Sequence, residues 1–177
     1  MTRRWSILSR PEPVPAEVLE RAALPRDDKV LASGVSRDGT WLLGTRRVLV
    51  LLTPEGRVLM PWETVEDASW DRDEEMLRIT GVGEYGRPRP SYSLTMEEPT
   101  LLLQLLRERV TASIVLQRRA PVRGRLGVMV IGRRSPVGGP VTWMHSYDPG
   151  LDPADPAVVA VADLLLAQVR SEVGDSI

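Results

Sequence analysis

Three neighbouring residues have the types of a hydrolase triad: His145, Ser146 and Asp148. In such a triad the histidine takes a proton from the serine, and the aspartate orients the histidine. The histidine must therefore lie within hydrogen-bond reach of the serine. Because neighbouring residues of a strand point to opposite faces, Ser146 cannot easily reach the His145 ring. We expect His145, the only histidine, to be structural or exposed, and we expect the protein not to be an enzyme.

A glycine-rich segment, GVGEYG at residues 81–86, matches the G-x-G-x-x-G pattern of dinucleotide-binding loops. In those loops the third glycine opens a helix whose N–H groups bind the pyrophosphate. Here the sequence RPRP follows at residues 87–90, and two prolines at that spacing exclude a helix interior. The segment is therefore predicted to be a flexible hairpin loop, and we expect no cofactor.

Metal chemistry has few candidate ligands in this sequence. The chain contains no cysteine and one histidine, which excludes disulfides, thiol nucleophiles and the usual zinc ligand sets. Residues 71–75 are rich in acids, but the glycine and the terminal glutamate of a twelve-residue calcium loop are missing. We interpret this segment as a solvated hairpin turn and predict no metal site.

Charge is distributed unevenly along the chain, although the formal net charge is only −1. Residues 101–134 hold eight arginines against one acid, whereas residues 61–80 hold seven acids against two arginines. One interpretation is that these charges pair internally or lie on a solvated face. The other is an anion-binding face, with RNA or DNA phosphate as one ligand. The candidate residues for that face are Arg118, Arg119, Arg123, Arg125, Arg133 and Arg134.

The elements that position these residues are mostly short strands. Residues 48–52, VLVLL, are apolar and β-branched, and the turn-forming sequence Pro54-Glu55-Gly56 follows them. This pattern predicts a buried strand. Similar patterns bounded by turn residues predict six more strands, at residues 30–35, 41–43, 57–60, 65–71, 76–80 and 91–96.

Three helices are predicted as well. A short helix at residues 15–24 is ended by Pro25, and the strongest helix, at residues 99–117, carries a leucine-rich stripe that we expect to close the open end of the strands. We expect Trp62 to be buried beside this long helix. Strands at residues 125–132 and 141–147 follow, and Asp155 caps a final helix that ends near residue 173.

Three motifs carry a resemblance to a known family: GTWLLGTR at residues 39–46, MPWE at 60–63 and EPTLLLQLLRERV at 98–110. The sequence resembles bacterial pleckstrin-homology-like (PH-like) domains over residues 29–112. More narrowly, it resembles an uncharacterised protein family of high-GC Gram-positive bacteria (actinobacteria) over most of the chain. The resemblance implies an α+β fold, with a seven-stranded antiparallel roll or barrel capped by a long helix. It implies no activity and no functional residue.

These observations predict three regions and a function. The regions are an N-terminal lead with a short helix (1–28), a PH-like domain (29–117) and a C-terminal β-β-α extension packed on it (118–177). Because there is no signal sequence and no long apolar run, we expect a cytoplasmic protein. We expect a non-catalytic module that binds a protein partner. The alternatives are nucleic-acid or anionic-surface binding through the arginine-rich segment 107–134, and an enzyme of unknown class.

Overall fold

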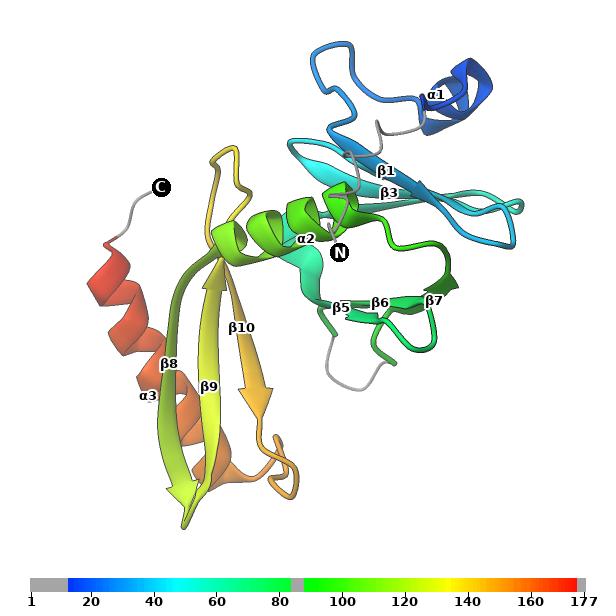
Figure 1. The fold of residues 1–177 in the computed structure, drawn as a ribbon. Helices are drawn as coiled ribbons and strands as arrows, with labels where there is room; N and C mark the ends of the chain where they lie inside the picture. The colour runs from blue at the N-terminus through cyan, green and yellow to red at the C-terminus, as the bar shows by residue number, and fades with distance from the viewer. Residues whose placement is uncertain (1–12, 84–87, 175–177) are drawn as a thin grey trace, which may run out of the picture.

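The computed structural model describes residues 13–83 and 88–174, so part of the glycine-rich loop lies outside the described residues. Within those ranges the chain forms three antiparallel sheets and three α-helices (Figure 1). The predicted α+β class is confirmed. None of the described helices has the length and apolar character needed to span a membrane.

The first sheet has four strands in the order β1-β2-β3-β4. Their bounds are Ala32–Val35, Trp41–Gly44, Val48–Leu52 and Arg57–Pro61. The short helix α1, Ala16–Ala22, covers one face and packs on Leu43, Val50 and Leu52. The opposite face supplies Leu42, Leu49 and Leu51 to the main core. Both faces are covered, which explains why β3 is apolar throughout rather than alternating.

The second sheet has three strands in the order β5-β6-β7. Their bounds are Val65–Asp71, Met76–Gly81 and Ser91–Thr95. In β6 the fully buried Leu77 and Ile79 alternate with partly exposed residues, as expected for a strand with one covered face. A single 3₁₀ turn, η1 at Trp62–Thr64, joins the two sheets.

Helix α2, Thr100–Ser113, lies over both sheets and contacts β1, β2, β5 and η1 (Figure 1). Its Leu102, Leu105 and Leu106 are buried, so these three leucines of the predicted stripe are core, whereas Leu103 and Val110 are only partly buried. The approach is closest at one point in β2, where a side chain in place of Gly44 would force Leu105 to shift. A Cβ atom on Gly44 would lie 2.5 Å from Leu105 Cδ2.

The seven predicted strands are confirmed, but the described residues contain no closed barrel. The chain turns at Pro61 and η1 between β4 and β5, and these strands belong to different sheets. Near the ends of β1 and β7, the Arg37 N–H donates a hydrogen bond to the Thr95 carbonyl at 2.8 Å. No continuous ladder of hydrogen bonds joins these two described strands, which belong to different sheets. The result is two sheets that share one core and one covering helix.

The predicted end of the long helix was wrong. α2 ends at Ser113, and the chain continues directly as strand β8, Ile114–Arg123, which the sequence patterns did not indicate. Ile114 and Leu116 pair with β9, and this pairing overrides the helical periodicity through residue 117. The predicted boundary between residues 117 and 118 lies inside β8.

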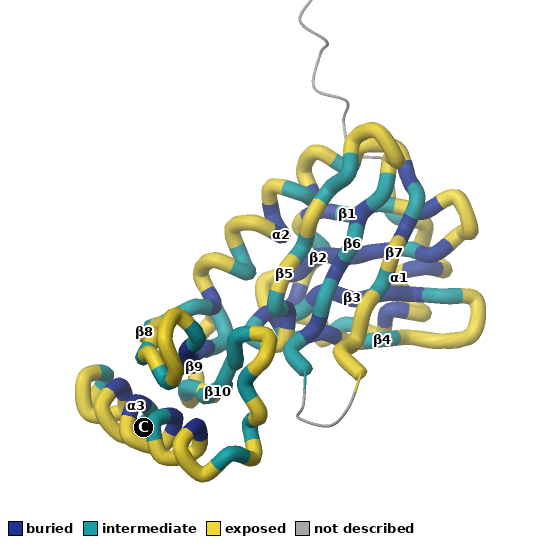
Figure 2. Tube along the Cα trace, turned by 90° about the horizontal axis from the view of Figure 1, so that it is seen from below, coloured by how far each residue is buried: buried dark blue, intermediate teal, exposed yellow. Residues whose placement is uncertain are grey.

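The third sheet therefore has three strands, in the order β10-β9-β8, rather than the predicted hairpin. β9 is Leu126–Arg133 and β10 is Thr142–Tyr147. Helix α3, Pro156–Val173, packs its buried residues on β8 and β9 (Figure 2). Its predicted cap is confirmed, because the Asp155 carboxylate accepts the Ala157 N–H at 2.8 Å.

Trp62 is the residue through which η1 contributes to the shared core. The side chain is 0% exposed, its indole N–H donates to the Thr45 carbonyl at 3.1 Å, and η1 contacts α2. Its predicted burial beside the long helix is confirmed.

We expect Trp62→Ala to lower the free energy of unfolding by about 3–5 kcal/mol in urea titrations. Trp62→Phe keeps most of the packing and should lose less. A loss below about 1 kcal/mol for Trp62→Ala would contradict the account.

Candidate functional site

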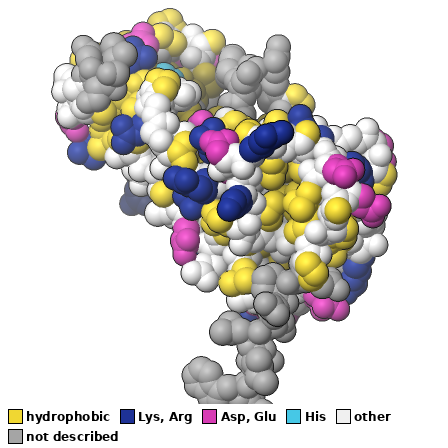
Figure 3. All heavy atoms as spheres, turned by 90° about the horizontal axis from the view of Figure 1, so that it is seen from above, with side chains coloured by type: hydrophobic (Ala, Val, Ile, Leu, Met, Phe, Trp, Pro, Cys, Tyr) yellow, Lys and Arg dark blue, Asp and Glu magenta, His cyan; other side chains and the backbone are white. Residues whose placement is uncertain are grey.

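Three of the six candidate arginines form ion pairs with acids of the C-terminal region. Arg118 lies 3.1 Å from Glu172 in α3, and Arg123 lies 3.1 Å from Asp155 at the start of that helix. Arg119 pairs with Asp148. The internal pairing considered from the sequence therefore occurs, but its acids are not those of residues 61–80. On the face in Figure 3, basic side chains lie beside acidic and apolar ones.

Arg133 is a structural residue, because its side chain is buried and its residue is 3% exposed. Its guanidinium donates to the carbonyls of Val65 and Glu66 at 2.9 and 3.1 Å, and to Ser113 Oγ at 2.9 Å. Burial lowers the pKa of Arg133, and the nearby Glu66 opposes that shift. Arg133 thus joins the third sheet to the first residues of β5 and to the end of α2.

The last two candidate arginines lie apart from these. Arg125 is exposed in the turn between β8 and β9, and Arg134 is half-buried just after β9. The structure therefore distributes the six residues over ion pairs, a buried bridge, a turn and a strand end. It does not bring the six together as one exposed face.

The residues of the suspected triad also have other roles. Asp148 accepts the Gly127 N–H at 2.9 Å in addition to its pair with Arg119. The His145 ring stacks on Tyr147, with centroids 6.1 Å apart and an interplanar angle of 29°. His145 and Ser146 are neighbours in β10, as the sequence indicated. No geometry among the described residues supports a nucleophile in this strand.

A groove between α2 and β5 is a candidate binding site that the motifs did not reveal. Its volume is about 620 Å³, and apolar side chains from both elements form its walls, among them Ala68, Trp70, Leu103 and Val110. Charged side chains border it, including an ion pair between Arg72 and Glu98 at 3.4 Å. The groove therefore combines apolar side chains with polar and charged ones, as binding sites for peptides and small molecules do.

One wall of this groove is an unpaired strand edge. β5 is the outer strand of its sheet, and Arg133 covers only the carbonyls of Val65 and Glu66. Residues 67–71 continue beyond that contact along the groove. In addition, the Trp70 indole N–H is buried and has no hydrogen-bond partner among the described residues. Buried donors are nearly always paired in native proteins, so an unpaired one beside the groove is unusual.

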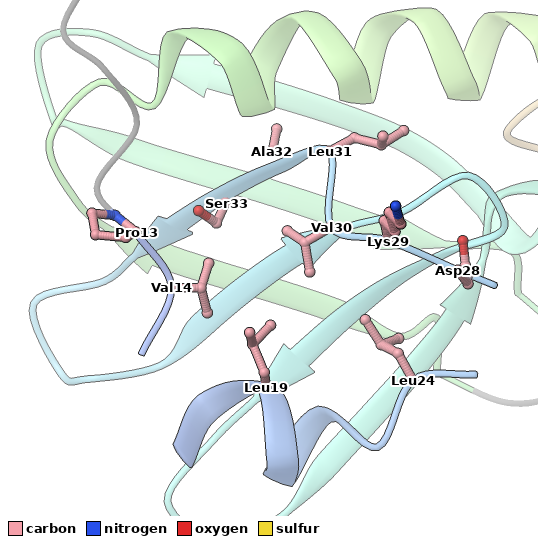
Figure 4. A pocket seen from close by; sticks show the side chains of 10 residues that line it. All are labelled: Pro13, Val14, Leu19, Leu24, Asp28, Lys29, Val30, Leu31, Ala32 and Ser33. Carbon is pink, nitrogen blue, oxygen red and sulfur yellow. The ribbon is translucent and has the colours of Figure 1, made fainter. Parts of the chain in front are cut away.

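A second pocket lies between α1 and the start of β1 (Figure 4). Its volume is about 530 Å³, and Val14, Leu19, Leu24 and Val30 point into the space between the two elements. The carboxylate at its polar end already has a hydrogen-bond partner, because Asp28 accepts a hydrogen bond from Thr45 Oγ1 at 2.8 Å. We therefore take the groove between α2 and β5 as the candidate functional site.

Comparisons with known proteins add no assignment to this geometry. No protein-family model matches the sequence. A search of curated proteins finds no match, and a search of solved structures finds none either. The resemblance to PH-like domains stays a prediction, and the function must be argued from the chain itself.

The ion pair of Asp148 predicts an acid-dependent stability. The Gly127 N–H and then Arg119 hold the pKa of the Asp148 carboxyl below its ordinary value of 3.8. A lowered folded-state pKa stabilises the protein above the unfolded value, and this contribution disappears as pH falls through the folded value.

We therefore expect wild type to be more stable than Asp148→Asn at neutral pH. The difference should shrink once the pH falls below about 4. Urea unfolding of both proteins from neutral pH to about pH 3 measures it. A difference that is independent of pH would show that the charge of Asp148 contributes nothing.

Proposed function

We propose that the protein is a non-catalytic interaction module with a PH-like fold, and that it binds an extended segment of a protein partner. The segment adds a strand to the free edge of β5 and places side chains in the groove against α2. The observation that carries the proposal is the unpaired edge of β5 beside a partly apolar groove of about 620 Å³.

The PH-like part of the proposal is supported by the order of the elements. Four antiparallel strands are followed by three more in a second sheet, and a long helix then packs on both sheets. This is the order that the sequence resemblance implies. The fold alone carries no function, so the proposal depends on the groove.

Strand addition explains why an open edge and an apolar groove occur together. An exposed edge presents main-chain N–H and C=O groups that can pair with an extended peptide. Residues 67–71 of β5 span about 17 Å, so about five residues of a partner can pair with them. Alternate side chains of that peptide point toward the groove between Trp70 and Leu103.

The arginines give less support to nucleic-acid binding. Non-specific binding to nucleic acid requires several cations that are free to neutralise phosphates. Arg118, Arg119 and Arg123 are already paired with carboxylates, and Arg133 is buried. An enzyme is supported by no residue set found in the described part of the chain. The peptide-binding proposal is therefore the one that the geometry favours.

A display selection with seven-residue peptides tests the proposal. We expect enriched peptides to carry apolar residues at alternate positions. Leu103→Glu, in the groove, should weaken their binding at least tenfold, measured by fluorescence polarisation at physiological salt. Leu164→Glu is the matched control, because Leu164 lies on α3 and is 73% exposed. It should leave the affinity within about twofold, since exposed substitutions change little.

Two results would overturn the proposal. One is a selection that yields no consensus peptide. The other is a set of enriched peptides that bind Leu103→Glu as tightly as wild type. N-methylation of alternate peptide amides supplies an independent test, because strand addition requires those N–H groups.

A further inference from the structure

A separate cavity of about 340 Å³ lies between η1, the segment after β6 and strand β10. None of its described lining residues also lines the groove between α2 and β5. Three regions that are distant in sequence therefore meet around one small space. Its described lining residues are Glu63, Thr64, Val82, Gly83, Thr142, Trp143, Met144, His145 and Tyr147.

Two polar atoms of this lining lack partners. Glu63 Oε2 and His145 Nε2 are both buried, and neither has a hydrogen-bond partner among the described residues. A buried polar atom without a partner costs free energy, so such atoms point to a missing ligand or water. A carboxylate oxygen can only accept a hydrogen bond, and Nε2 of a neutral imidazole accepts one when Nδ1 carries the proton.

Both atoms have almost no exposed area, so they lie just below the surface of the cavity that their residues line. The last torsion of glutamate and of histidine joins an sp³ to an sp² carbon, and such torsions are broad and roughly two-fold. Rotation about these torsions is the movement that would bring either acceptor to a ligand. The two acceptors together favour a ligand group that carries several N–H donors.

The charge and the walls of the cavity restrict the ligand further. Glu63 is the one carboxylate among the nine described lining residues, and none of the nine is Lys or Arg. A cation is therefore favoured over an anion. Val82 and Met144 offer apolar contact, and aromatic rings such as Trp143 attract cations through their faces.

We propose that this cavity binds a small primary amine in its ammonium form, attached to an apolar or aromatic body. An ammonium group carries three N–H donors and can satisfy Glu63 Oε2 and His145 Nε2 together. The body lies against the apolar and aromatic walls. The size of the cavity, near the lower end for ligand sites, restricts the ligand to a small molecule.

Calorimetric titration with phenethylamine tests the proposal, with 3-phenylpropionate and 2-phenylethanol as matched compounds. Phenethylamine should bind at least tenfold more tightly than either of them. Glu63→Gln should weaken amine binding at least tenfold. The control is Glu55→Gln, in the exposed turn between β3 and β4, which should leave the affinity unchanged.

A spectroscopic readout keeps the test decisive even if Glu63→Gln fails to fold. His145 is the only histidine, so its ring resonances report on the cavity without ambiguity. Phenethylamine should shift them in the wild-type protein. The proposal is overturned if the amine leaves these resonances unshifted, if 3-phenylpropionate binds as tightly, or if folded Glu63→Gln binds the amine like wild type. These outcomes are independent of peptide binding in the other groove.

Discussion

Burial of one face of α2 against two sheets is the interaction on which the rest of the structure depends. Leu102 and Leu106 are almost fully buried, and Leu105 packs where Gly44 leaves room for it. Neither sheet closes on the other, so each would expose apolar surface without the helix. Burial of three leucine side chains contributes several kcal/mol, which is comparable to the net stability of a small domain.

The same packing creates the proposed binding site. A helix that buries one stripe against the core leaves its flank half-exposed, and Leu103 and Val110 lie on that flank beside β5. Among the described residues the edge of β5 is free because β5 is an outer strand of its sheet. Arg133 fixes the third sheet against the first carbonyls of this edge, so the structural bridge and the proposed site are adjacent on β5. Stability and the proposed binding thus use different faces of the same elements.

Local signals in the sequence predicted most elements and missed what depends on distant contacts. The apolar run at residues 48–52 correctly predicted β3, and the capping residue Asp155 correctly predicted the start of α3. Both signals lie within or next to the segment that they predict. β8 was missed because its pairing with β9 overrides a helix-like pattern. The ion pair of Arg118 joins residues 54 positions apart, which no local pattern reveals. The groove beside Trp70 has no motif at all, since it is formed by a strand edge and a helix flank.

Native-state hydrogen exchange measures most directly whether α2 holds the two sheets together. If it does, the amides of α2 and β3 open only in the same global unfolding event and share the slowest exchange rates in the protein. Their protection should then fall together as urea is added. Fast exchange throughout α2, with β3 still fully protected, would contradict the account, because the sheets would then be stable without their covering helix.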